Sequence, residues 1–334
     1  MSAGQYTAET RELAGPRMTG QRRTMAKSPI EILHVGSAAR DMTADDPRGW
    51  RLGGGTSYAA LTTARLGIRT AAVVGADAAA ASATELDLLR SAGVDVLVVP
   101  LAESPVFVND ETPEGRIQTC VAPGRPLPAV ELPRSWMDAL AWSIVPVAAE
   151  VGDRWASAMP PGVIVSVGWQ GWLRILTAGA TVQRRAPASS PLLRRANLVG
   201  VSRHDLAPGT QAADLAGLLR PGADLLVTEG VLGGRLWPVR RDGVGDPIQY
   251  PAIASDGEVD PTGAGDTFLA ALLASLVRPS LLPGGRTDPA ARLDFAAAAA
   301  SLVIEDIGLL GVPDLTAVHT RHARRSRPSG GPPS

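Results

Sequence analysis

Short apolar runs alternate with segments of helical periodicity along most of this chain. Runs rich in Val, Ile and Leu without polar interruption are typical of strands buried on both faces. We expect strands at 30–36, 70–74, 95–99, 143–146, 163–167, 198–201, 224–228 and 236–239. We expect helices after Gly55 and at 83–92, 138–140, 172–177, 212–219, 266–277 and 290–304. This order predicts an α/β fold, in which a mostly parallel central sheet is covered by helices on both faces.

One segment does not fit inside such a sheet. Residues 105–121 alternate in polarity as a hairpin does, with Thr112 to Gly115 as its turn. Both ends of the chain lack periodicity. We therefore expect a disordered extension over 1–27, one domain over 28–318, and a disordered tail over 319–334 that is rich in Arg, Pro, Ser and Gly.

Composition narrows the class of protein. The chain has 334 residues, 45% of them hydrophobic, and a formal net charge of -1, so nothing in the balance favours nucleic acid or an anionic membrane as a partner. The single cysteine excludes an intrachain disulfide and suits a reducing compartment. There is no apolar run long enough to span a bilayer and no secretory signal pattern, so we expect a cytoplasmic protein.

Lysine is almost absent. Lysine and arginine together number 32, and the only lysine is Lys27. No glycine-rich loop ends in Gly-Lys, so the phosphate-binding loop of P-loop enzymes is excluded. A protein of this composition that moves phosphate must do so with backbone dipoles, arginine and metal.

The most informative motif is Asp260-Pro-Thr-Gly-Ala-Gly-Asp266, which leads directly into an apolar helix. The free N–H groups of a first helical turn can gather around an anion, and glycines there allow a close approach. Asp266 places a carboxylate at the same point, where a hydroxyl could lose its proton as a phosphoryl group arrives. A simple helix cap is the alternative, but a cap alone needs no glycines.

The heptapeptide resembles the C-terminal signature of the ribokinase-like (PfkB) family of sugar and nucleoside kinases. Gly53-Gly-Gly-Thr-Ser-Tyr58 is similar to the N-terminal glycine signature of that family, and Leu226–Gly234 to its nucleotide-side strand and turn. The segment Gln170-Gly-Trp-Leu-Arg174 looks like one found in a branch that includes inositol kinases. The order and spacing match over roughly residues 30 to 315.

The resemblance implies a set of site residues and cofactors. Asp266 would be the general base, and Gly263, Ala264 and Gly265 would bind the transferring phosphoryl group. The acceptor would contact Asp41, Gly53, Gly54, Asn109 and Gln170, and ATP would lie against Thr228, Gly230, Gly233 and Gly308. Ser202 and Asp205 replace the outer residues of the Asn-x-x-Glu tetrad of the family, and would organise Mg²⁺ through water. Segments 40–52 and 105–121 would form a small β lid, and a homodimer is compatible with this picture.

We therefore expect an ATP-dependent phosphotransferase that acts on an alcohol group of a small sugar or cyclitol. A nucleoside kinase of the same fold stays open, and would need an aromatic clamp for the base from Trp50, Tyr58, Phe107 or Trp169. An inactive, ligand-sensing relative also stays open. A dinucleotide oxidoreductase is disfavoured because no Gly-x-Gly-x-x-Gly follows the first strand.

Overall fold

The computed structural model describes residues 29–112 and 115–325. Within them, ten strands form one central sheet. Its parallel part runs in the order β14-β13-β9-β8-β1-β4-β5, and β15, β16 and β17 extend the β14 edge in antiparallel fashion. The strands are β1 Ile32–Ser37, β4 Thr70–Ala76, β5 Asp95–Pro100, β8 Ala141–Ile144, β9 Ile164–Gly168, β13 Leu198–Ser202, β14 Asp224–Thr228, β15 Gly234–Arg240, β16 Gly243–Val244 and β17 Ile248–Tyr250. The predicted α/β fold is confirmed.

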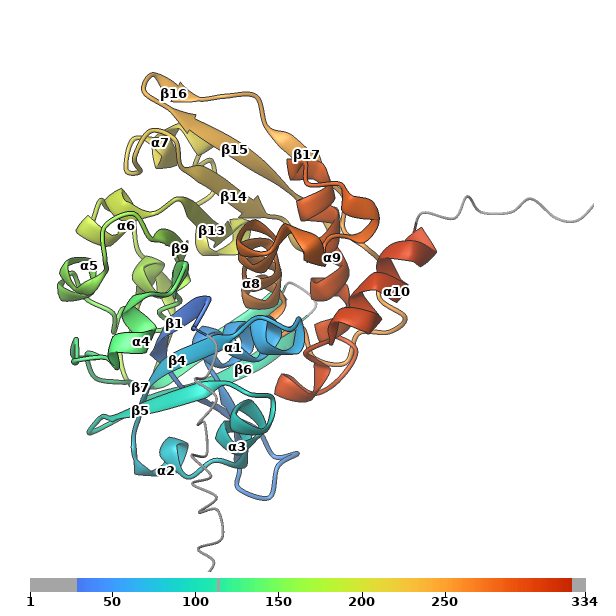
Figure 1. Ribbon diagram of the computed structural model, residues 1–334. Coiled ribbons are helices and arrows are strands. Elements are labelled where there is room, and N and C mark those ends of the chain that lie inside the picture. Colours follow the sequence, from blue (N-terminus) through green and yellow to red (C-terminus); the bar gives the residue numbers. More distant parts are fainter. Residues whose placement is uncertain (1–28, 113–114, 326–334) are drawn as a thin grey trace, which may run out of the picture.

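Helices cover both faces of this sheet, because the strands are largely apolar throughout and successive side chains point to opposite sides. In β8, Trp142 packs in the core beneath the short helices, whereas Ala141 packs beneath the long ones. Figure 1 shows α5 and α6 on one side of the sheet and α8 and α9 on the other. The short helices are α4 Arg134–Met137, α5 Arg154–Ala158, α6 Pro191–Arg195 and α7 Ala212–Ala216. The opposite layer contains α1 Gly55–Arg65, α3 Thr84–Ser91, α8 Ala264–Val277, α9 Pro289–Val303 and α10 Leu315–Arg325, and α2 Ala78–Ala81 follows β4.

A second, small sheet is built from the two segments that we expected to form a lid. Its order is β11-β7-β6-β2-β3, with β2 Ala39–Met42, β3 Trp50–Gly53, β6 Pro105–Thr112, β7 Gly115–Pro123 and β11 Ala180–Thr181. The predicted hairpin is the β6–β7 pair. Residues 113 and 114 of its expected turn lie outside the described residues. We call this unit the small sheet.

The structure corrects three boundaries. The helix expected at 172–177 is wrong, since Gln170–Leu173 forms a 3₁₀ turn and Arg174–Ile175 is strand β10, paired with β12 Gln183–Arg184. The helix expected at 138–140 lies earlier, as α4. The tail expected to be disordered from 319 is helical to Arg325, because Arg321 is buried and bonds Glu305 at 2.7 Å. The expected extension over 1–27 lies outside the described residues.

No helix in the described part of the chain has both the length and the apolar character needed to cross a membrane.

Candidate active site

The candidate residues gather at the carboxyl ends of the parallel strands, where α/β sheets usually bind ligands. Asp41 follows β1, Gln170 follows β9, Asp205 follows β13 and Thr228 ends β14. These four strands are neighbours or near neighbours in the sheet (Figure 1). The topology therefore places side chains that are far apart in sequence along one edge.

The triple glycine lies between two carboxylates. A Cβ atom placed on Gly53 would collide with the Asp41 carboxylate, and one placed on Gly55 would lie 2.6 Å from Oδ1 of Asp266. Gly54 has a φ of 94°, and a Cβ there would lie 2.5 Å from the Ser37 carbonyl oxygen. We expected Gly53 and Gly54 to press against the substrate. Because these glycines have no side chain, the carboxylates of Asp41 and Asp266 can also pack against the glycine loop, one on Gly53 and the other on Gly55.

The start of α8 leaves backbone donors free. Gly263 precedes the helix with a φ of 82°, and a Cβ atom there would enter the ring of the buried Tyr58. Within the described residues, the N–H groups of Gly265 and Asp266 have no backbone acceptor, as the first turn of a helix requires. A Cβ atom on Gly265 would meet nothing within 4 Å. This turn therefore offers open donors beside the Asp266 carboxylate.

Burial and two charged groups shift the pKa of Asp266. Burial raises the pKa of Asp266 from 3.8 to about 6; the Arg174 guanidinium opposes that rise, and the Asp205 carboxylate adds to it. Burial also raises the pKa of Asp205, against the nearby charge of Arg174 and a hydrogen bond from Gln170. A carboxylate of this kind is still mostly ionised at neutral pH, yet it is a better base than an ordinary aspartate.

Arg174 is the site residue that the sequence reasoning passed over. Burial lowers the pKa of its guanidinium, and the carboxylates of Asp205, Asp266, Asp41 and Glu150 oppose that change in this order. Its Nη1 donates to the Val147 carbonyl at 3.1 Å. The Gln-Gly-x-x-Arg segment contains this residue, but the sequence predicts only Gln170 of that segment as a site residue.

The acceptor candidates on the small sheet form a chain of hydrogen bonds. Asn109 of β6 donates through Nδ2 to Oδ1 of Asp41 at 3.1 Å, and Gln118 of β7 donates to Oδ1 of Asn109 at 2.6 Å. Asp41 and Asn109 are thus brought together as expected. Asn109 bonds Oδ1 of Asp41, and Oδ2 of Asp41 lies on the side of Gly53.

Gln170 lies beside the candidate metal residues. Its Nε2 donates to Oδ1 of Asp205 at 3.5 Å, and Ser202 accepts a bond from the His204 N–H at 3.2 Å. No group of three or more His, Cys, Asp or Glu side chains within the described residues is placed to hold a metal ion. A Mg²⁺ ion here would therefore need ligands from phosphate and water, which is how Mg²⁺ usually binds.

The donor candidates form a second group. Ser202 and Thr228 are register partners at the ends of β13 and β14. Gly230 has a φ of 58° and open space around it, whereas a Cβ on Gly233 would collide with the Tyr250 carbonyl, so the glycine at 233 is needed for packing. The carboxylate of Asp260 accepts bonds from the N–H groups of Thr262 at 2.9 Å and Gly308 at 3.1 Å, which joins the α8 motif to the Gly308 turn.

Apolar side chains are exposed around these donor candidates. Val231 and Leu232, which follow β14, are 86% and 72% exposed. Val259 and Leu310, on the two segments joined by Asp260, are 57% and 62% exposed. Large apolar side chains exposed in a group often mark a surface where a ligand binds.

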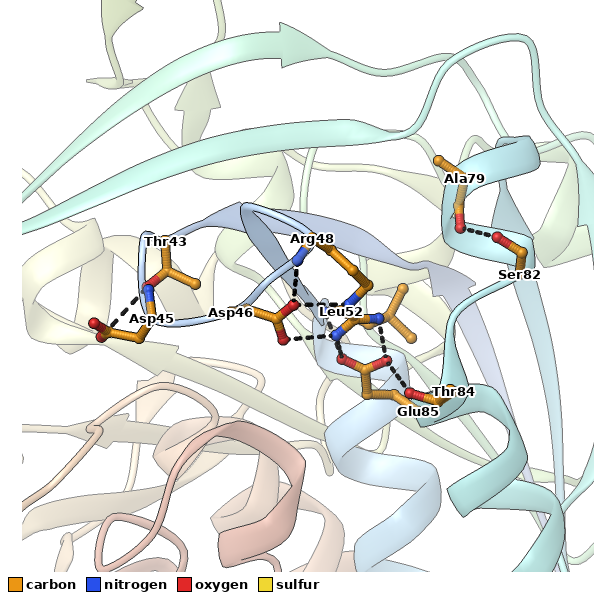
Figure 2. A network of polar contacts seen from close by, with 9 residues as sticks. All are labelled: Thr43, Asp45, Asp46, Arg48, Leu52, Ala79, Ser82, Thr84 and Glu85. Carbon is orange, nitrogen blue, oxygen red and sulfur yellow. Dashed lines mark hydrogen bonds and ion pairs between the residues drawn. The ribbon is translucent and has the colours of Figure 1, made fainter.

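The turn between β2 and β3 is fastened to α3 by charge, as Figure 2 shows. Arg48 bonds both oxygens of Glu85, at 2.6 and 2.8 Å, and both oxygens of Asp46, at 2.9 and 3.0 Å. Glu85 also accepts from the Leu52 N–H at 3.1 Å, and the Arg48 guanidinium lies 4.6 Å from the centre of the Trp50 ring. The network holds β3, and with it the triple glycine, against the central domain.

Glu150 organises the loop after β8 from within. Its side chain is 3% exposed and accepts backbone N–H groups of Ser37 at 2.9 Å, Val147 at 3.1 Å and Ala148 at 2.8 Å. Burial raises the pKa of this carboxyl, although these hydrogen bonds oppose the rise. Glu150 therefore ties the ends of β1 and β8 together beneath Arg174.

The chain is similar to known proteins in part of its sequence and in its fold. Residues 192–314 match the sequence profile of the pfkB family carbohydrate kinases. No match was found among curated protein sequences. Several solved structures share the fold. A pyrophosphate-dependent kinase in the ribokinase family, complexed with a pyrophosphate analog and myo-inositol, is 18% identical with a TM-score of 0.66, covering 86% of this chain and 99% of that one.

Two further structures of similar fold are kinases with other ligands or activities. Ribokinase of Arabidopsis thaliana, complexed with ribose and ATP, is 20% identical with a TM-score of 0.62, covering 88% of this chain and 99% of that one. A nucleoside kinase of Methanocaldococcus jannaschii, an archaeal member of the ribokinase family, is 17% identical with a TM-score of 0.63, covering 89% and 99%. The predicted resemblance to the ribokinase-like (PfkB) family is confirmed, through the family match over 192–314 and the shared fold over most of the chain.

Proposed function

We propose that this protein transfers a phosphoryl group from ATP to a hydroxyl group of a small sugar or cyclitol. The observation that carries the proposal is the triple glycine held between Asp41 and Asp266. A polyol resting on this loop has one carboxylate available to accept its hydroxyl hydrogens and another available to take the proton of the reacting hydroxyl. Two acidic groups with different environments are suited to two such roles.

The α8 turn supplies the remaining parts of a phosphoryl transfer. The N–H groups of Gly265 and Asp266 point to where charge would develop on the phosphoryl oxygens, with Gly263 and Ala264 forming the same turn. Arg174 lies among the carboxylates and keeps their combined charge from repelling an anionic donor. Asp266 accepts the proton from the acceptor hydroxyl and holds it at its carboxylate until the product leaves.

The donor set fits magnesium that arrives with the phosphates. The Asp205 carboxylate and the Ser202 hydroxyl are hard oxygen ligands near the end of β13, and neither belongs to a closed protein cage within the described residues. When bound, Mg²⁺ would offset phosphate charge. Asp205 and Ser202 would hold its water shell, and Gln170 would orient Asp205.

Exposed apolar residues support ATP rather than pyrophosphate as donor, although a related fold belongs to a pyrophosphate-dependent kinase. Val231 and Leu232 follow Gly230 in the chain, Leu310 lies two residues after Gly308, and all three side chains are exposed, as is Val259. A purine bound against these segments would cover apolar surface. Pyrophosphate has no apolar part and would leave these side chains in water. Gly233 would contribute through the shape of its turn.

Burial of aromatic residues supports a polyol rather than a nucleoside. Of the residues considered for a base clamp, Tyr58, Phe107 and Trp169 are each no more than 2% exposed, and Trp50 is engaged by Arg48. The acceptor side instead presents the Asp41–Asn109–Gln118 chain, which suits hydroxyl groups. The small sheet would close over this acceptor and exclude water.

A screen of turnover tests the proposal. ADP release from ATP, and phosphate release from pyrophosphate, should be measured with pentoses, hexoses, inositols and nucleosides as acceptors. We expect acceptor-dependent ADP release with at least one sugar or inositol, abolished in Asp266→Asn. Faster phosphorylation of a nucleoside than of every polyol would favour the nucleoside kinase, and no transfer with any donor would favour an inactive, ligand-sensing protein.

A further inference from the structure

A cavity of about 220 Å³ is lined in part by Arg174. It is lined by the segments after β7, after β8 and around β10 and β12. Three of its lining residues are arginines, namely Arg125, Arg174 and Arg185. The proposed reaction gives no role to Arg125 or Arg185.

The charge of this cavity is not balanced. Its only acidic lining residue is Glu150, whose carboxylate faces the N–H groups of Ser37, Val147 and Ala148. Among the described residues, Arg125 and Arg185 have no ion pair, and their side chains are exposed. Arg40 of the small sheet, by contrast, pairs with Asp77 at 3.0 Å.

The backbones of the two unpaired arginines are fixed. The N–H of Arg185 donates to the Leu173 carbonyl at 2.7 Å, which places it beside the start of β10, where Arg174 lies. The N–H of Arg125 donates to the Glu103 carbonyl at 3.1 Å. Two arginines are therefore held at the rim of a cavity whose wall contains a third.

We propose that this cavity binds an anionic group, a phosphate or a carboxylate, carried by the acceptor at a position remote from the hydroxyl that is phosphorylated. This inference rests on the proposed function and narrows its acceptor to an acidic polyol. Arg174 lines the cavity and also interacts electrostatically with the carboxylates of Asp41 and Asp266, so this side chain connects the cavity with the proposed acceptor site. Arginine is suited to both anions, because its planar guanidinium can donate two parallel hydrogen bonds to a carboxylate or a phosphate.

Binding measurements without a donor test the cavity independently of transfer. Calorimetry should compare D-glucose, D-glucuronate and D-glucose 6-phosphate, which differ only in the group at one ring substituent, and myo-inositol with myo-inositol 1-phosphate. The proteins are the wild type, Arg125→Gln, Arg185→Gln, and the control Arg194→Gln, which removes the charge of an exposed arginine on α6 outside the cavity. Comparing D-glucuronate with D-glucose 6-phosphate shows whether the cavity prefers a carboxylate or a phosphate on the ligand.

We expect an acidic member of at least one series to bind about tenfold or more tightly than its neutral partner, as charged hydrogen bonds provide. Each cavity variant should reduce that preference about tenfold without weakening the neutral ligand, and Arg194→Gln should retain it. Equal binding of acidic and neutral members in both series, or a preference that survives Arg125→Gln and Arg185→Gln, overturns the inference. Selective binding of an acidic polyol with no transfer from ATP or pyrophosphate would instead refute the proposed kinase and leave the cavity assigned.

Discussion

Replacing the proposed base should stabilise the protein while it removes activity. Asp266 ionises in a place where its charge is poorly solvated, which is why its pKa is raised to about 6. Asparagine keeps the size of the side chain and needs no ionisation. Asp266→Asn therefore removes the free-energy cost of holding a poorly solvated charge in the folded state at neutral pH.

The magnitude follows from the shift in pKa. The difference between 3.8 in the unfolded chain and about 6 in the folded protein is roughly two units, and each unit corresponds to about 1.4 kcal/mol. The folded state holds its proton more tightly, so the wild type is most stable below pH 3.8 and loses stability as the pH rises through about 6. At pH 7 the variant should be more stable by about 1–3 kcal/mol, and the advantage should shrink toward pH 4.

Thermal melting from pH 4 to 8 measures this, with Asp242→Asn as the control because Asp242 is an exposed aspartate in the turn before β16. The melting temperature of Asp266→Asn should exceed that of the wild type at pH 7 by a few degrees, whereas Asp242→Asn should follow the wild type throughout. A variant that is less stable at pH 7, or whose advantage does not change with pH, would refute the reasoning.

The same substitution should lower turnover by a factor on the order of 10²–10⁴, the usual scale for general acid–base catalysis. In the wild type, kcat/KM should rise with pH and level off above about 6, since only the ionised carboxylate accepts a proton. Near-normal turnover of the variant with its true acceptor would show that Asp266 is only a helix cap.

Three further substitutions test the acceptor site, the start of α8 and the packing of α10. Asp41→Ala should raise the acceptor KM at least tenfold and leave the KM for ATP nearly unchanged; parallel increases in both would place Asp41 outside the acceptor site. Gly263→Ala should destabilise the fold by about 1–3 kcal/mol, because its φ of 82° is unfavourable and its methyl group would enter the Tyr58 ring, and an unchanged melting temperature would contradict this packing. Arg321→Ala should cost about 1–3 kcal/mol, because the partly exposed Glu305 loses its charged hydrogen bonds from Arg321; denaturant unfolding at the wild-type midpoint would contradict a stabilising role for this pair.

The parts of the fold that could be predicted are those set by local pattern. The strand at 224–228 was predicted to the residue, and the helix expected at 266–277 begins at Ala264 and ends at Val277. The long apolar α9 was predicted within one residue at each end. In each case continuous apolar sequence and a turn or glycine at the boundary agree with the final environment.

The errors occur where distant contacts decide the local structure. Arg174 and Ile175 form a strand because residues 183 and 184 pair with them, and no local signal at 172–177 reveals that partner. The last helix continues past residue 319 because Arg321 reaches Glu305 and Ala254, although its own sequence is polar. Sequence composition alone could not separate such a helix from a disordered tail.

The same limit explains what was missed at the candidate site. Asp41, Gly53 and Asp266 could be nominated from motifs, but only the folded chain places the Asp41 carboxylate on Gly53 and the Asp266 carboxylate on Gly55. Arg174 is a candidate site residue because of the carboxylates around it, and these come from four separate segments of the chain.

In the proposed phosphoryl transfer, Arg174 would offset the charge of the several acidic residues at the site. Asp41, Asp205 and Asp266 would together repel phosphate, and the only lysine of the chain, Lys27, lies outside the described residues. A partly buried guanidinium interacts with all three carboxylates at once, and it keeps its charge because arginine does not lose its proton in proteins. Replacing it by lysine would concentrate the charge at one point and sacrifice the two-sided reach toward the carboxylates and the cavity.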